Sequence, residues 1–210
     1  MPLPTPHFAA LRYLDFWLLH DERNCADLAP DQPPEVRRQA LVRIATVYKV
    51  SRNFWGEHEA GHDRLNPVRV ALEAISEPPT QGNVNEYVTR FMRELHGIYH
   101  QMVLSAASKI LWHRFRDPVI IFDNISLEAL QGLGYVVEDG NYHQFITAWQ
   151  AAYNGALPGI IASCANLPAV IQYSWHAPEL RVNQVEVLAH EEWFRRRVFD
   201  FMLWYYRAPY

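Results

Sequence analysis

The sequence predicts an all-α fold, and three observations support that prediction. Half of the 210 residues are hydrophobic, which is enough to build a sizeable core. Apolar residues recur three and four positions apart over much of the chain, as they do along the buried face of a helix. The strand-like run at 119–122 is short and has no obvious partner. We expect a compact multi-helix domain that spans 1–210, built as a single body or as two closely packed helical lobes.

In the first half of the chain, proline, glycine and polar runs separate the expected helices. Helices are expected over 8–20, 35–54 and 68–75. In the first of these, the residues predicted to share one face are Phe8, Leu11, Leu14, Trp17 and Leu18. The longest helix is expected from 84 or 85 to 116, with a break near Gly97. Asp117-Pro118 ends it, because a residue before proline is pushed away from helical geometry.

The second half of the chain is also predicted to be helical after the extended run at 119–122. A helix is expected at 124–133, with Ile125, Leu127 and Leu130 buried. Three more are expected at 141–153, 159–175 and 183–206. Two segments that contain glycine, Gln131-Gly132-Leu133-Gly134 and Leu157-Pro158-Gly159-Ile160, are predicted to be loops.

Charge, cysteine content and hydropathy exclude several classes of protein. The net charge of -4 at pH 7 argues against a protein that coats nucleic acid through bulk positive charge. The two cysteines, Cys25 and Cys164, match no metal-ligand spacing, which fits a reducing compartment. The N-terminus lacks a signal-peptide pattern, and no apolar run reaches the roughly 18 to 20 residues that span a bilayer. We expect a cytoplasmic protein with no membrane partner, no obligate protein partner, no metal and no cofactor.

The segment from Ser105 to Asp123 carries the strongest chemical signal. Lys109, one of only two lysines in the chain, lies in a helix of small and apolar residues, and Asp123 ends the following apolar run. An amine in a dry environment is a potential nucleophile, because burial disfavours its charged form. Helical spacing places Lys109 beside Trp112 and His113, at the edge of an apolar face. The alternative to a catalytic role is that Lys109 is an ordinary surface lysine and Asp123 is the N-cap of the next helix.

A Ser-Lys pair in an apolar helix, followed by a turn, an apolar run, Asp and another helix, resembles the catalytic segment of the helix-hairpin-helix DNA glycosylases, in particular the 8-oxoguanine glycosylase-like branch. The match covers about twenty of the 210 residues. The family hairpin, Leu-Pro-Gly-Val-Gly, is not evident, and His96-Gly97-Ile98-Tyr99 stands in its general place. Fewer residues of sequence separate Lys109 from Asp123 than is typical of the family.

The resemblance implies an enzyme that excises a base from double-stranded DNA. Lys109 would be the nucleophile that attacks the sugar of a flipped nucleotide, and Asp123 would stabilise the positive charge that develops on that sugar. Strand cleavage is an optional later step. The implied target is an oxidised purine, and the hypermodified bases of invading phage DNA are a second option that would make the protein part of anti-phage defence.

Several residues are candidates for contact with DNA. Arg52, Asn53, Ser105 and Asn124 carry groups that suit phosphates or base edges. Trp112 is a candidate to stack on the flipped base, and the other aromatic candidates are Trp55, Tyr99 and Phe122. The arginine run 195–197 is predicted to be a solvated helix face.

Two other functions compete with this hypothesis. His58-Glu59-Ala60-Gly61-His62 matches the zinc-hydrolase pattern H-E-x-x-H, in which two histidines bind the metal and the glutamate is the base. Glycine and proline crowd that segment, which is unfavourable for the long helix that such a site needs. The candidates for a third ligand are Glu73, Glu77, His96 and His100. The second alternative is a non-catalytic helical module that binds DNA or protein.

Overall fold

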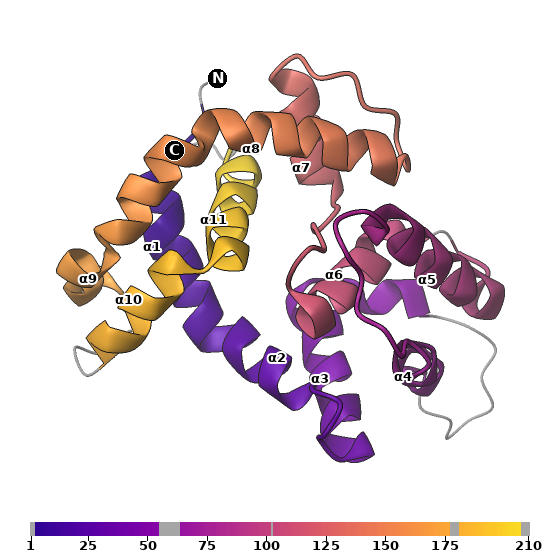
Figure 1. The fold of residues 1–210 in the computed structure, drawn as a ribbon. Helices are drawn as coiled ribbons and strands as arrows, with labels where there is room; N and C mark the ends of the chain where they lie inside the picture. The colour runs from indigo at the N-terminus through magenta and orange to yellow at the C-terminus, as the bar shows by residue number, and fades with distance from the viewer. Residues whose placement is uncertain (1–2, 55–63, 102, 177–180, 207–210) are drawn as a thin grey trace. The chain divides into compact units, whose positions relative to one another are not determined.

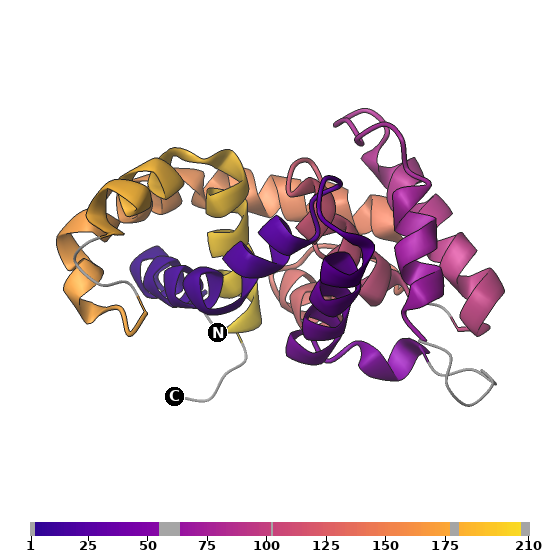
Figure 2. The same cartoon turned by 90° about the horizontal axis from the view of Figure 1, so that it is seen from below.

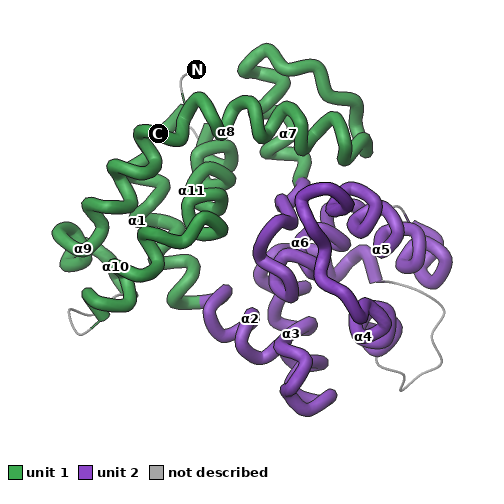
Figure 3. Tube along the Cα trace, viewed as in Figure 1, with its two compact units in different colours: residues 1–19, 123–210 green, residues 20–122 purple. Residues whose placement is uncertain are grey.

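A computed structural model describes residues 3–54, 64–101, 103–176 and 181–206 of the chain. Within these ranges every regular element is a helix and no strand is present, which confirms the all-α prediction. The chain forms two compact units (Figure 3): unit 1 contains residues 1–19 and 123–210, and unit 2 contains residues 20–122. Unit 2 is therefore one continuous stretch of chain, whereas unit 1 is assembled from the two ends.

Unit 1 is built around α1 (Pro6–Phe16), α8 (Tyr142–Ala165) and α11 (Glu192–Trp204), which pack against one another (Figure 1). The other elements of this unit are α7 (Asn124–Gly132), α9 (Leu167–Val170), the 3₁₀ turn Ile171–Tyr173 and α10 (Val182–His190). Aromatic rings fill the centre. The Tyr13 ring lies 4.9 Å from Phe194 and 5.1 Å from Phe201, so α1 and α11 share a tightly packed core.

The start of α1 follows from its sequence, and its buried face matches the prediction at Leu14 and Trp17 but not at Phe8. The Thr5 hydroxyl accepts the Phe8 amide, and Pro6 occupies the first turn, where its missing N–H costs nothing. The buried side is formed by Ala9, Ala10, Tyr13, Leu14 and Asp15, whereas Phe8 is 39% exposed. A π-helical turn at Trp17–Asp21 then shifts the register of the helix, so a regular helical spacing does not describe residues 8–20.

Unit 2 contains α2 (Glu22–Asp27), α3 (Pro34–Val47), the 3₁₀ turn Ser51–Phe54, α4 (Asn66–Glu73), α5 (Val84–Tyr99) and α6 (Leu104–Phe115). Neighbouring helices pack in the order α2 on α3, α3 on α4, α4 on α5 and α5 on α6, and α3 also contacts α6 (Figures 1 and 2). Helix α6 thus lies between α3 and α5. It is buried around its whole circumference from Ala106 to His113, which is typical of a central core helix.

The break expected near Gly97 is confirmed and lies three residues further along the chain: His100 adopts left-handed geometry with φ of 55° and ends α5, and α6 begins at Leu104. Two other predicted helix boundaries are wrong. The expected helix at 35–54 ends at Val47, and Lys49 has a positive φ of 55°. The helix expected at 183–206 is interrupted at Glu191, which has extended geometry.

The Leu157–Ile160 segment is also not a loop, because α8 continues through Pro158 and is the longest of the described helices. The second predicted loop is partly helical, since α7 runs to Gly132 before Gly134 turns the chain with φ of 94°. Leu127 and Leu130 of α7 are buried as predicted, but Ile125 is 49% exposed. Among the described helices, none alone has the length and apolarity to cross a membrane; only α8 taken together with Leu167–Tyr173, a pair bent by 53°, has them.

Candidate functional site

Lys109 is a buried residue of α6 in unit 2. Its side chain is on the buried part of the helix, with 7% of the residue exposed, so the interpretation as a surface lysine is wrong. The Nζ atom donates a hydrogen bond to the Ser105 hydroxyl at 2.9 Å, one helical turn away. It also lies 5.9 Å from the centre of the Tyr48 ring, within reach of a cation–π interaction. The contacts of Lys109 thus include a neutral hydroxyl and an aromatic face.

A buried polar cluster, which the sequence analysis missed, underlies this lysine. Its members are Asp21, Tyr48 and His113. The Tyr48 hydroxyl lies 3.0 Å from both carboxylate oxygens of Asp21, and Nε2 of His113 lies 3.2 Å from Asp21 Oδ1. Nδ1 of His113 lies 2.8 Å from the backbone carbonyl oxygen of Lys109. The cluster therefore connects the turn of α6 that carries Lys109 to the start of unit 2.

The hydrogen-bond partners of His113 define where its protons lie. A carbonyl oxygen can only accept, so Nδ1 must carry a proton to make its bond with Lys109. On the other side of the ring, Nε2 faces the Asp21 carboxylate. The side chains of both residues have no solvent exposure. This arrangement holds the backbone of α6 rigidly at Lys109, because breaking it would leave buried polar groups unpaired.

The chain that leads from Lys109 toward Asp123 is attached to α6 by Ser108. The Ser108 hydroxyl accepts the Phe122 amide at 3.0 Å and lies 3.4 Å from the Phe122 carbonyl oxygen. Residues 119–122 are buried and belong to no helix or strand. The end of this run is thus fixed to the helix that carries the lysine.

Asp123 caps α7, the first helix after the extended run. Its Oδ1 accepts the Ser126 amide at 2.8 Å, which confirms the interpretation of this residue as an N-cap. Its Oδ2 accepts the indole N–H of Trp204 at 2.5 Å, and the residue is 7% exposed. The Trp204 ring in turn stacks on Phe201 at 5.1 Å between centroids. Both carboxylate oxygens are therefore oriented by donors from unit 1. The sequence did not indicate the contact with Trp204.

The two predicted catalytic residues belong to different units. Lys109 lies within unit 2, and Asp123 is the first residue of the second part of unit 1. The structure describes the surroundings of each residue in its own unit. Their joint action on one nucleotide stays a prediction.

The predicted DNA-contacting residues differ in accessibility. Arg52 is exposed on the 3₁₀ turn Ser51–Phe54, and Asn124 is exposed on the first turn of α7. Asn53 and Ser105 are partly exposed, and the Ser105 hydroxyl is engaged by Lys109. Trp112 is 1% exposed and packs edge-on against His113, so its ring has no open face for a base. Trp112 is therefore a core residue, and its predicted role in stacking on a base is wrong.

The other aromatic candidates give the same result where they can be assessed. Phe122 and Tyr99 are 3% and 2% exposed, and the Tyr99 hydroxyl donates to the Arg64 carbonyl. Both rings therefore belong to the core. Trp55 lies outside the described residues. No described candidate thus offers an exposed ring face for a flipped base.

The arginine run 195–197 is not the solvated face that the sequence predicts. Arg197 is 1% exposed and pairs with Asp200 at 2.6 Å, while the indole of Trp149 donates to the other oxygen of Asp200 at 2.7 Å. Complete burial raises the pKa of Asp200 to about 6, although Arg197 acts in the opposite direction. Arg197 also lies over the Tyr13 ring. This cluster is a structural centre of unit 1.

The predicted zinc motif, His58 to His62, lies outside the described residues. Within the described part of the chain, no group of three metal-ligating side chains is present. Of the suggested third ligands, Glu73 is engaged by Arg37 and Arg69.

Comparison of the chain with models of protein families, with curated proteins and with solved structures gave no match.

Proposed function

We propose that the protein is a DNA N-glycosylase of the helix-hairpin-helix type, related to the 8-oxoguanine glycosylases, with Lys109 as nucleophile. The observation that carries this proposal is the environment of Lys109, which is 7% exposed in the central helix of unit 2 and hydrogen-bonded to a neutral hydroxyl. Burial favours the neutral form of an amine, which is the form that can attack carbon. Ser105 then acts as a positioning residue that directs Nζ.

The proposed reaction begins with attack of neutral Nζ on C1′ of the flipped nucleotide. The C1′–N bond breaks, its electron pair leaves with the base, and the base takes up a proton while the lysine nitrogen loses one. Opening of the sugar ring converts the adduct to a Schiff base. Elimination of the 3′ phosphate from that Schiff base would cleave the strand.

Asp123 supplies negative charge in this proposal. Departure of the base builds positive charge on the sugar, and a carboxylate fixed in advance stabilises that charge without reorganisation. The Ser126 amide and the Trp204 indole hold the two oxygens of Asp123 in place. Arg52, Asn53 and Asn124 remain candidates for contact with the DNA.

Covalent trapping tests the nucleophile. Borohydride reduction should join the protein to duplex DNA that carries an abasic site, or a substrate base from a panel of oxidised and hypermodified bases. Peptide mass spectrometry should locate the adduct on Lys109. Lys109→Gln should abolish trapping, and Lys49→Gln, which removes the chain's other lysine from an exposed position, should not. An adduct on any other amine, or no adduct across the panel, would refute the proposal.

The carboxylate has a separate test. Asp123→Asn should lose base release from the substrate but retain trapping on a preformed abasic site, because the abasic sugar no longer has a base to lose. Equal loss of both activities would show that Asp123 supports the fold of the site rather than the cleavage of the glycosidic bond.

A further inference from the structure

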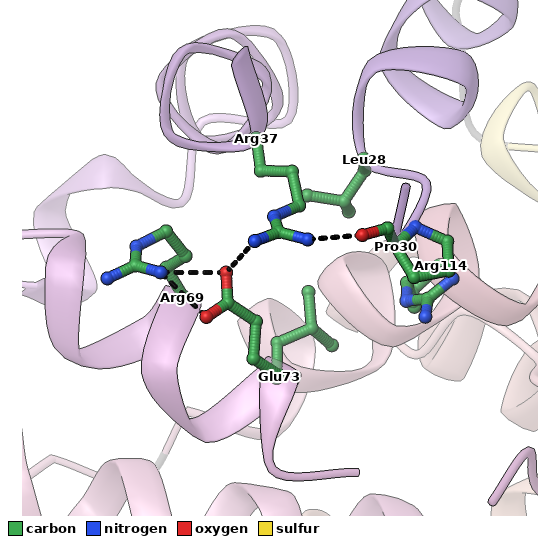
Figure 4. Close-up of a pocket in the computed structure, with 7 residues that line it drawn as sticks. Leu28, Pro30, Arg37, Arg69, Glu73 and Arg114 are labelled. Atoms are coloured by element: carbon green, nitrogen blue, oxygen red, sulfur yellow. Dashed lines mark hydrogen bonds and ion pairs between the residues drawn. The ribbon is translucent and has the colours of Figure 1, made fainter. Parts of the chain in front are cut away.

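Unit 2 contains a pocket of about 260 Å³ between the first turn of α3, the residues of α4 from Arg69 to Glu73 and the end of α6 (Figure 4). Its lining residues are Leu28, Pro30, Arg37, Arg69, Leu72, Glu73 and Arg114. Three guanidinium groups and one carboxylate thus surround it, which leaves a net charge of +2. A concentration of arginines around a cavity is the arrangement by which proteins bind oxyanions.

Glu73 holds two of these arginines in position. Its carboxylate lies 2.8 Å from Arg37 and 2.6 Å from Arg69, and the Arg69 guanidinium also contacts Asn66 at 2.8 Å. The Arg37 guanidinium donates in addition to the Pro30 carbonyl at 2.6 Å. Figure 4 shows both guanidinium groups directed at the same carboxylate. The two side chains are therefore fixed before any ligand arrives, which lowers the entropy cost of binding.

Donor capacity remains after these contacts. Nε of Arg37 is buried and has no hydrogen-bond acceptor among the described residues. A buried donor without an acceptor is unfavourable by about 1–3 kcal/mol, so such groups commonly mark a ligand or an ordered water.

Arg114 adds a third positive charge to the pocket. It is partly buried, and its guanidinium lies over the Phe115 ring at 5.1 Å. Burial and the charge of Arg37 both lower the pKa of Arg114, while the exposed Asp31 acts in the opposite direction. Positive charge is therefore in excess at this end of the pocket, and an anion would relieve that excess.

We propose that the pocket formed by Arg37, Arg69 and Arg114 binds a phosphate group. Its four oxygens can each accept more than one hydrogen bond, which matches converging guanidinium groups. The volume of about 260 Å³ is below the usual range for whole organic ligands of about 300–1,000 Å³, so the phosphate rather than an attached molecule occupies the site. The phosphate is either a backbone phosphodiester of DNA or a free phosphate. This proposal does not depend on the glycosylase reaction.

Isothermal titration of the full chain with inorganic phosphate, at constant ionic strength, tests the site. Wild type should show saturable binding at one site, and Arg114→Gln should weaken it at least tenfold without unfolding, because the carboxylate contacts of Arg37 and Arg69 remain. Arg23→Gln, which changes an arginine whose side chain is 74% exposed, is the matched control and should bind within about twofold of wild type. Circular dichroism confirms the fold of each variant. No saturation up to about 10 mM phosphate, or equal binding by Arg114→Gln, would overturn the proposal.

A second variant tests the role of Glu73. Glu73→Gln keeps a side-chain oxygen that can accept from Arg37 and Arg69 and hold them in position, but it removes the negative charge that opposes an anion. The variant should therefore bind phosphate several-fold more tightly, and phosphate should raise its melting temperature more than that of wild type. Weaker binding by a folded Glu73→Gln variant would overturn the proposal.

Competition with unmodified duplex DNA distinguishes a backbone phosphodiester of DNA from a free phosphate as the ligand. Displacement of bound phosphate from wild type, observed by ³¹P NMR, assigns the site to the DNA backbone. Simultaneous binding of both assigns it to a free phosphate. Because neither measurement records base release, failure of the glycosylase proposal would leave these results unchanged.

Discussion

Removal of the indole N–H of Trp204 tests whether this residue holds the Asp123 carboxylate. Trp204→Phe keeps an aromatic ring to stack on Phe201 and deletes the donor that bonds Oδ2 at 2.5 Å. Asp123→Ser keeps an N-cap acceptor for Ser126 and deletes the oxygen that reaches the indole. The two changes together form a double-mutant cycle that isolates one hydrogen bond.

The size of the effect follows from charge and burial. A hydrogen bond to an ionised group contributes about 1.5–3 kcal/mol, and Trp204 is partly exposed, so we take the lower end. Each single variant should therefore lose about 1.5–2.5 kcal/mol of unfolding free energy. For a chain of this length that corresponds to a melting temperature lower by roughly 3–10 °C. The coupling energy of the cycle should be about 1.5 kcal/mol.

Urea unfolding of the four proteins, followed by circular dichroism at pH 7, measures this coupling. Trp175→Phe is the matched control, since Trp175 is 80% exposed and its loss should change stability by less than about 0.5 kcal/mol. Additivity of the two changes within about 0.5 kcal/mol would refute the assignment of Trp204 as the residue that positions Asp123.

Three further predictions concern other parts of the chain. Burial raises the pKa of Asp200 to about 6, so between about pH 4 and 6 the folded state keeps a proton on Asp200 that the unfolded state has lost. The unfolding free energy should therefore fall by up to about 3 kcal/mol as pH rises through that window. Urea unfolding of wild type and Asp200→Asn at several pH values isolates the part of this change that Asp200 causes. Tyr48→Phe should cost about 1–3 kcal/mol in thermal unfolding, because it removes the donor to the buried Asp21; no change would show that Asp21 finds another donor. Gly132→Ala should destabilise the fold by about 1–3 kcal/mol, because the new Cβ would lie 2.9 Å from the Tyr206 ring. Gly97→Ala meets nothing within 4 Å and should stabilise the fold by up to about 1 kcal/mol. The reverse order of melting temperatures would contradict this packing.

The local arrangement around Lys109 and Asp123 could be predicted because its signals are local. Proline at 118 ends a helix, an apolar run follows, and an aspartate directly before a helical pattern is a favourable cap. The partners of the site could not be predicted in this way. His113 meets Asp21 across 92 residues of sequence, and Trp204 meets Asp123 across 81. Such contacts are set by tertiary packing, which the spacing of residues along one helix does not encode.

The error at Pro158 has a similar physical cause. Proline inside a helix removes one hydrogen bond and is unfavourable by about 3 kcal/mol, so a break was the expected outcome. Helix α8 nevertheless continues, because it packs on both α1 and α11, and an added Cβ at Gly159 would lie 3.4 Å from Pro6 of the first helix. Burial of α8 against α1 and α11 offsets the unfavourable effect of Pro158 on the helix.

The insertion of unit 2 between the two parts of unit 1 has a consequence for synthesis on the ribosome. Residues 20–122 emerge as one piece and can complete their unit while translation continues. Helix α1, in contrast, has no α11 to pack against until the last part of the chain has been made. At about 5–20 residues per second that delay is on the order of ten seconds or more, during which the apolar side of α1 is open to chaperones and to other nascent chains.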